Sequence, residues 1–141
     1  MSGTSNKRRV MWLMNHGTLR AFEVPLLVSM VTGARSLGIE VQAPYLASAR
    51  ECAESLQLNR VRFINQDARD ADLSQGTVFY LYSPFKGSIL ACVLNALRME
   101  SRRRSIKVCS LGSCTSTIAN ETWLKAGSFP DGERITVFES Q

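Results

Sequence analysis

Two carboxylates stand where short apolar runs of the chain end. The run over residues 37–41 alternates apolar with polar or small residues, as a β-strand does, and Glu40 lies at its end. The run over residues 61–64 is followed by Asp67. The segment between them, which begins near Pro44, has apolar residues at helical spacing. Strands joined in this way lie parallel, so we expect both carboxylates at one edge of a sheet, where they can accept hydrogen bonds from a ligand.

This order of elements resembles the middle of a class I S-adenosylmethionine-dependent methyltransferase. The resemblance rests on GIEV at residues 38–41, on the amphipathic helix after it, and on RVRFINQDAR at residues 60–69. It implies that Glu40 binds the ribose hydroxyls of the cofactor, S-adenosylmethionine. It also implies that Asp67, with its neighbour Ala68, lies beside the adenine amino group.

A second segment, LYSPF at residues 81–85, resembles the family's motif at the end of the fourth strand, beside the transferred methyl group. The whole resemblance spans roughly residues 24–112. The motif implies a cofactor contact at Tyr82 and a substrate-side cleft formed by Ser83, Pro84 and Phe85.

The loop Asn15–Glu23 departs from the family's pattern. The family has a glycine-rich loop here, whose glycines let the backbone approach the methionine part of the cofactor. Only Gly17 remains as an implied cofactor contact, and the other glycine positions hold Thr18, Arg20 and Phe22. Two functions therefore stay open: a methyltransferase, and a catalytically inactive relative that acts as a binding or partner protein.

The catalytic residues stay unassigned. The cofactor's sulfonium is already activated, so methyl transfer needs no nucleophile–base pair that a sequence would reveal. The acceptor, a protein or a small molecule, is equally unassigned. His16 has no obvious partner and is expected to be structural or solvent-facing. For Asp67, capping of the following turn is as compatible with the sequence as adenine binding.

Strands that alternate with helices predict an α/β fold with a doubly wound, mostly parallel sheet of about six strands and helices on both faces. The expected strand order is 3-2-1-4-5, with an antiparallel last strand beside the fifth. Residues 113–130 have room for a hidden further strand. The single domain is expected to cover residues 9–141 after a disordered tail at residues 1–8. The remaining strands are expected at residues 10–14, 77–82, 106–111 and 134–140.

Three further helices are expected. Residues 24–32 are apolar nearly all round, which predicts a deeply covered helix. A helix from Ser88, its expected cap, to about Arg103 should bury the stripe Ile89, Leu90, Val93, Leu94 and Leu97. A short helix is expected around residues 119–125.

The composition indicates an ordinary globular domain, with 141 residues and a net charge of +5. Much of the positive excess lies at Lys7–Arg9 and Arg102–Arg104. We expect these to be a solvated tail and a solvated helix end. A nucleic-acid surface is the weaker alternative, because no aromatic stacking pattern accompanies the arginines. No apolar run approaches the ~20 residues of a membrane helix, so a cytoplasmic protein without membrane contact is expected.

The cysteines do not predict a metal site, because no pair has C-x-x-C spacing and the chain has one histidine. Cys52, Cys92 and Cys109 lie in apolar patterns and are expected to be buried. Cys114 lies in an expected loop and is predicted to be the most accessible of the four.

Overall fold

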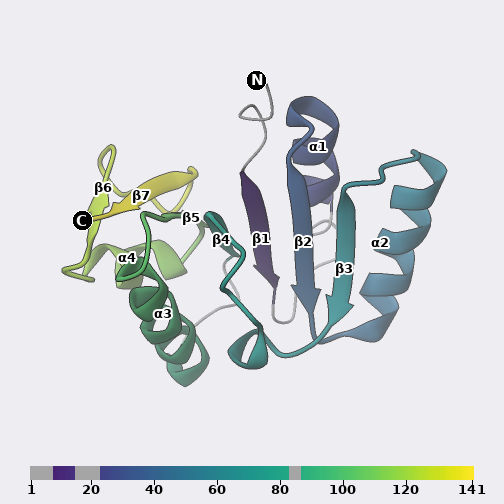
Figure 1. The fold of residues 1–141 in the computed structure, drawn as a ribbon. Coiled ribbons are helices and arrows are strands. Elements are labelled where there is room, and N and C mark those ends of the chain that lie inside the picture. The colour runs from purple at the N-terminus through teal and green to yellow at the C-terminus, as the bar shows by residue number, and fades with distance from the viewer. Residues whose placement is uncertain (1–7, 15–22, 83–86) are drawn as a thin grey trace.

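The computed structural model describes residues 8–14, 23–82 and 87–141. Within them the chain forms one seven-stranded sheet in the order β3-β2-β1-β4-β5-β7-β6, flanked by helices (Figure 1). The strands are β1 (Arg9–Met14), β2 (Arg35–Glu40), β3 (Val61–Asn65), β4 (Val78–Tyr82), β5 (Lys107–Leu111), β6 (Leu124–Ala126) and β7 (Thr136–Ser140). The helices are α1 (Glu23–Thr32), α2 (Ala43–Ser55), the 3₁₀ turn η2 (Ala68–Asp70), α3 (Gly87–Ser101) and α4 (Cys114–Ala119).

The strand directions confirm the predicted doubly wound sheet. Strands β1 to β5 are parallel, and β7 pairs with β5 in the antiparallel sense. The sheet has one strand more than the six expected, because β6 pairs with β7 at the outer edge, within the segment 113–130 where the sequence left room for a further strand. This strand replaces the second half of the helix expected at residues 119–125. The observed helix, α4, ends at Ala119. Leu124 lies in β6, which pairs with β7, and its side chain is buried.

Alternation along the strands divides the core between the two faces of the sheet. On one face, Met11, Leu13, Phe79 and Leu81 pack beneath α3 and α4. On the other, Val61 and Phe63 pack against α1 and α2. Figure 1 shows α1 behind the sheet next to β2, with α3 beside the opposite half of the sheet. Helices therefore cover both faces, as predicted.

Helix α3 buries the stripe that the sequence predicts. Leu90, Val93, Leu94 and Leu97 are all at most 1% exposed, and Ile89 packs partly buried against the same cluster. The helix begins at Gly87, whose φ of +60° favours glycine. Ser88 therefore lies inside the first turn, and its prediction as the cap is wrong.

Helix α1 is not deeply covered, contrary to its apolar sequence. Leu26 joins the cluster formed with α2 and β3. Leu27, Met30 and Val31 on the outer side are 56%, 53% and 82% exposed. The helix packs through one side only, because among the described elements its main contacts are with β2 and β3.

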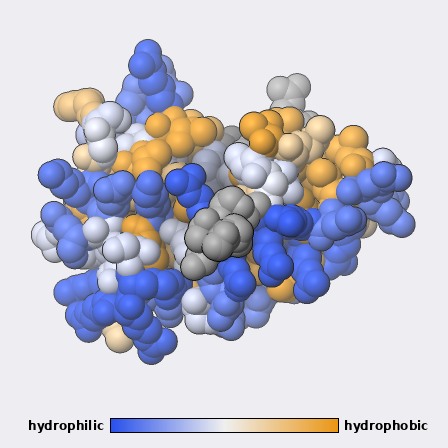
Figure 2. Space-filling model, turned by 45° about the horizontal axis from the view of Figure 1, so that its top comes forward, coloured by the Kyte–Doolittle hydropathy of each residue, from blue (hydrophilic) through white to orange (hydrophobic). Residues whose placement is uncertain are grey.

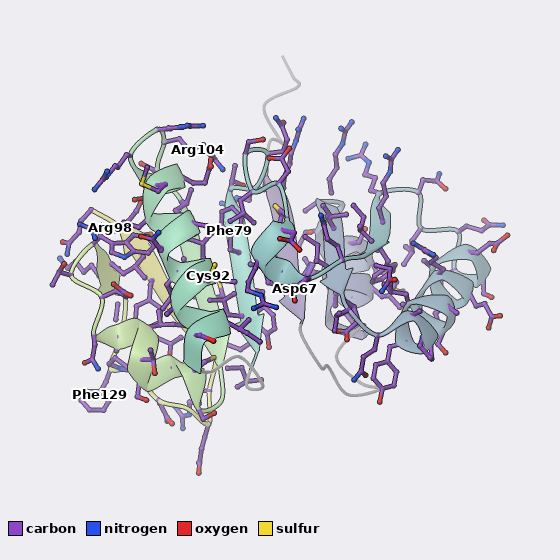
Figure 3. The ribbon with its side chains drawn as sticks, turned by 90° about the horizontal axis from the view of Figure 1, so that it is seen from below. Asp67, Phe79, Cys92, Arg98, Arg104 and Phe129 are labelled. Atoms are coloured by element: carbon purple, nitrogen blue, oxygen red, sulfur yellow. The ribbon has the colours of Figure 1, made fainter. Side chains whose placement is uncertain are left out.

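The cysteine predictions are largely reversed. Cys52 and Cys92 lie on exposed helix faces, and Cys92 is visible on α3 in Figure 3. Cys114 is buried in the first turn of α4, where its Sγ lies 3.7 Å from the carbonyl oxygens of Leu81 and Leu111. Burial raises the pKa of the Cys114 thiol. Cys109 is half-buried.

Arg104 fastens the connection between β3 and β4 to the end of α3. Its Nη1 donates to Glu100 Oε1 at 2.6 Å, and Nε and Nη2 donate to the carbonyl of Gly76. Nη2 also reaches the carbonyl of Leu73 at 2.9 Å. Arg104, labelled near the end of α3 in Figure 3, is therefore a structural residue of the basic run at residues 102–104 rather than a solvated charge.

None of the helices that the structure describes is long and apolar enough to cross a membrane.

Candidate functional site

The carboxyl ends of five parallel strands meet at one edge of the sheet. Met14 at the end of β1 is in register with Glu40 at the end of β2, and Glu40 is in register with Asn65 at the end of β3. Tyr82 at the end of β4 is in register with Leu111 on β5. The chain leaves β1 through α1 towards β2, while β4 lies on the other side of β1. This is the topological switch point at which ligands bind in such sheets.

Glu40 lies at this edge with its carboxylate buried. Only 3% of the residue is exposed. Its Oε1 accepts a hydrogen bond of 3.2 Å from the backbone N–H of Gln42, which lies just before α2. Burial of a carboxylate is costly unless hydrogen bonds compensate it. The hydrogen bond from Gln42 compensates part of this cost and holds the carboxylate at the predicted position.

Asn65 fixes the point where the chain leaves β2. Its Nδ2 donates to the carbonyl of Glu40 at 3.1 Å and to the carbonyl of Val41 at 2.8 Å. The backbone N–H of Gln66 donates to the same Glu40 carbonyl at 3.1 Å. Asn65 is not among the site residues predicted from the sequence. The available signal was an amide side chain at the end of the run at residues 61–65, beside a strand that ends in Glu40.

Asp67 caps the turn that follows β3. Its Oδ1 accepts from the backbone N–H of Arg69 at 2.8 Å, at the start of η2. The guanidinium of Arg69 donates to both carboxylate oxygens, at 2.9 and 2.8 Å, and this contact raises the pKa of Arg69. The capping interpretation is confirmed as a local contact, while adenine binding stays a prediction. Figure 3 looks onto this edge and shows Asp67 near the middle of the molecule.

Of the other predicted site residues, two lie within the described residues and four lie outside them. Ala68 is 2% exposed and packs into the core beside α3, so its side chain serves the core, and only its backbone remains as a ligand contact. Tyr82 ends β4 at the predicted edge. Gly17, Ser83, Pro84 and Phe85 lie outside the described residues. The structure thus brings Glu40, Asp67 and Tyr82 to one edge.

Solved structures of other proteins share this architecture, and two of the three described next are methyltransferases by name. A putative methyltransferase from Escherichia coli has a TM-score of 0.73 at 9% identity, with 98% of this chain and 80% of that chain covered. An RNA methyltransferase from Salinibacter ruber, solved with S-adenosyl-L-homocysteine, has a TM-score of 0.65 at 21% identity, with 96% and 82% covered. MtNAS, solved with MTA and tNA, has a TM-score of 0.66 at 15% identity and 95% of this chain covered.

The chain spans about half the length of MtNAS, since 53% of that chain is covered. No family model matches the sequence, and no curated protein matches it. At these identities the likeness concerns the fold. The chain has the Rossmann-like fold of the class I methyltransferases.

Proposed function

We propose that this chain is an S-adenosylmethionine-dependent methyltransferase. The observation that carries the proposal is the buried carboxylate of Glu40 at the carboxyl end of β2, beside the switch point of the sheet. The methyltransferase fold supports the same function. The acceptor, a protein or a small molecule, stays open.

Glu40 serves the proposed function by accepting hydrogen bonds from two neighbouring hydroxyls. A carboxylate has two oxygens and can accept from both at once. One oxygen of Glu40 is already oriented by the N–H of Gln42, and the backbone around it is held by Asn65. A preorganised acceptor of this kind loses little entropy when a ribose binds. The carboxylate therefore positions the nucleoside end of the ligand.

Asp67 serves the same ligand from the next strand. Its carboxylate is 21% exposed, and it is held by the cap and the ion pair with Arg69. A carboxylate oxygen can accept several hydrogen bonds, so an adenine amino group can bind without displacing Arg69. The bound cofactor supplies an activated methyl group, and the protein supplies orientation and exclusion of water.

The neighbours support this ligand class. The Salinibacter ruber methyltransferase was solved in complex with S-adenosyl-L-homocysteine. A mutant form of MtNAS was solved in complex with S-adenosylmethionine. The chain has the same fold around the same kind of sheet edge, so we assign it the same kind of cofactor.

A catalytically inactive relative is the second candidate. The loop at residues 15–23 favours it, because Thr18, Arg20 and Phe22 stand where the family has glycines. Such a protein would keep the fold and act as a binding or partner subunit. Cofactor affinity separates the two candidates, since a partner subunit has no need to bind S-adenosylmethionine.

The site is tested by a matched pair of glutamate variants. Glu40→Gln keeps the side-chain volume and removes the charge at the proposed ribose contact. Glu54→Gln makes the same change on the exposed side of α2. We expect Glu40→Gln to weaken S-adenosylhomocysteine binding by roughly 1–3 kcal/mol, and Glu54→Gln to leave it unchanged, in calorimetric titrations. Equal affinity of both variants and the wild type would remove Glu40 from the site.

A further inference from the structure

A groove of about 620 Å³ lies on the face of the sheet opposite α1 and α2. It crosses β1, β2 and β3, and four arginines line it: Arg9, Arg35, Arg60 and Arg62. Figure 2 shows strongly hydrophilic residues gathered over this part of the molecule. Glu40 is not among the lining residues, so the groove is separate from the proposed ribose contact.

The groove exists because the connection from β3 to β4 contains only one short 3₁₀ turn. Residues 66–77 cross the sheet with η2 packed against α3, and Ala68 and Leu73 enter the core there. Arg104 holds the end of this connection to α3. The connection thus covers the side of the sheet near α3. Among the described elements, no helix lies over β2 and β3 on this face.

Strand register places three of the arginines in a row. Arg9 and Arg35 are direct partners on β1 and β2. Arg60 stands next to Arg35, because its carbonyl accepts from the N–H of Ser36, and Ser36 pairs with Val61. Neighbouring strands lie about 4.8 Å apart, so the row spans roughly 10 Å at the amino ends of the strands. Alternation puts Arg62 on the same face, two residues further along β3.

Much of the hydrogen-bonding capacity of these arginines is unused. Arg35 and Arg62 are exposed and make no hydrogen bond or ion pair through their guanidinium groups with any residue that the structure describes. Arg60 donates one bond to the carbonyl of Gly33, and Arg9 donates one to Gln75 Oε1. Each guanidinium carries five N–H donors in a planar fork that matches a phosphate.

The acidic residues of the groove do not cancel this charge. Asp70 and Asp72 line it, against four arginines. Asp72 uses its Oδ1 on the backbone N–H of Ser74. The three salt bridges of the described chain, Arg69–Asp67, Arg104–Glu100 and Lys107–Glu139, involve none of the four arginines. The groove therefore presents a surplus of positive charge.

The walls and the floor of the groove differ in polarity. Leu37 and Ile64 give the floor an apolar surface that is partly exposed. Asn59, Gln66 and Gln75 add amide groups that can donate and accept hydrogen bonds. A ligand that fits has strong anionic groups at intervals and flat apolar groups with polar edges. Nucleotides combine both, whereas an acidic peptide carries carboxylates without a flat base. A lipid surface is too flat to enter a groove.

We propose that this groove binds the phosphates of nucleotides in single-stranded nucleic acid. Phosphates lie against the arginine row, and a base lies on the apolar floor. The inference goes beyond the proposed function and does not depend on it, because nucleotide binding here needs neither the cofactor edge nor methyl transfer.

The test is fluorescence anisotropy of a labelled RNA about twelve nucleotides long with the full chain across a series of salt concentrations, since such a strand covers one single-strand site. Arg35→Gln with Arg62→Gln removes two groove charges, and neither side chain holds another described residue. Lys125→Gln with Arg134→Gln removes two exposed charges at the opposite end of the sheet. We expect the groove variant to bind about tenfold more weakly, and the slope of log affinity against log salt to fall by about 1.4, at about 0.7 per phosphate contact. The control variant should match the wild type.

Two competitors identify the occupant. A nucleoside triphosphate that displaces the labelled RNA at the same nucleotide concentration shows that one nucleotide fills the site, and a much weaker displacement shows that the strand is recognised. Either result supports a nucleotide-phosphate site. Polyglutamate that competes as well as RNA would overturn the proposal in favour of an acidic peptide. Equal loss of binding in the groove and control variants, or no binding by the wild type, would also overturn it.

Discussion

Glu40 is the residue on which the proposed cofactor site depends, and Asn65 holds the backbone around it. Asn65→Ala removes two hydrogen bonds, to the carbonyls of Glu40 and Val41. We expect a loss of about 1–2 kcal/mol in the free energy of unfolding, because the Glu40 carbonyl bond is partly buried. Nucleoside binding should weaken as well, since the carboxylate loses its orientation. Chemical denaturation and calorimetry measure the two effects, and Asn59→Ala is the control. Unchanged stability and affinity would show that Asn65 does not organise the site.

Asp67 allows its two roles to be separated. Asparagine caps a turn about as well as aspartate, so Asp67→Asn keeps the cap and loses only the charge towards Arg69. The ion pair is partly exposed and is expected to contribute less than about 1 kcal/mol to stability. We therefore predict a nearly unchanged melting temperature with a clearly weaker affinity for S-adenosylhomocysteine. An unchanged affinity would leave Asp67 as a capping residue alone.

At the scale of the elements, α3 is the main support of its face of the sheet. Leu94→Ala should cost roughly 2–5 kcal/mol, through lost transfer energy and a cavity under the helix. Leu27→Ala is the matched control, because Leu27 lies on the open side of α1 and is 56% exposed. Its cost should stay below about 1 kcal/mol. Similar losses for both variants in urea denaturation would contradict the burial pattern.

The loop at residues 15–22 lies outside the described residues and remains a prediction from sequence. Arg20 would bring a positive charge towards the sulfonium of S-adenosylmethionine, and S-adenosylhomocysteine lacks that charge. We predict that the protein prefers the demethylated ligand. Substituting glycine at positions 18, 20 and 22 together should strengthen S-adenosylmethionine binding and so reduce the difference in affinity between the two ligands, measured by calorimetry. A triple variant that binds no better than the wild type would show that these side chains do not obstruct the site.

The sequence predicts well those elements whose local signals agree with their tertiary setting. The stripe of α3 and the strand ending in Glu40 are examples, because apolar spacing and burial coincide there. The prediction fails where tertiary contacts decide. The sequence left room for a strand within residues 113–130 but did not place it at residues 124–126, because its pairing with β7 cannot be read from an apolar pattern. The exposure of the outer side of α1 likewise depends on which elements pack against the helix, and its own apolar residues do not reveal this.

The candidate site is harder to predict than the fold. The positions of Glu40 and Asp67 after two neighbouring strands are predicted correctly, because strand ends can be located by periodicity. The capping bond of Asp67 is one of two open interpretations, and the hydrogen bonds of Asn65 are missed, since both depend on backbone groups that meet only in the folded chain. The arginine groove is missed as well. Its members are spread over residues 9–62, and only the strand register brings them together.

At the scale of the whole molecule, one sheet presents two separate surfaces. The carboxyl edge carries Glu40, and the face over β2 and β3 carries the arginine groove. Gln66 lines the groove and follows β3 directly, so the groove extends towards the carboxyl edge. A strand of nucleic acid bound along the groove would therefore lead towards the proposed cofactor site. Both surfaces can be measured on the same purified chain.

Binding of the methyltransferase cofactor at the carboxyl edge of the sheet is tested most directly by calorimetric titration. The wild-type chain is titrated with S-adenosylmethionine and with S-adenosylhomocysteine. We expect one site per chain for both ligands, with S-adenosylhomocysteine bound more tightly. The protein must first be shown to be folded by cooperative melting. If such a protein then gives no heat of binding with either ligand at millimolar concentration, cofactor binding at this edge is contradicted.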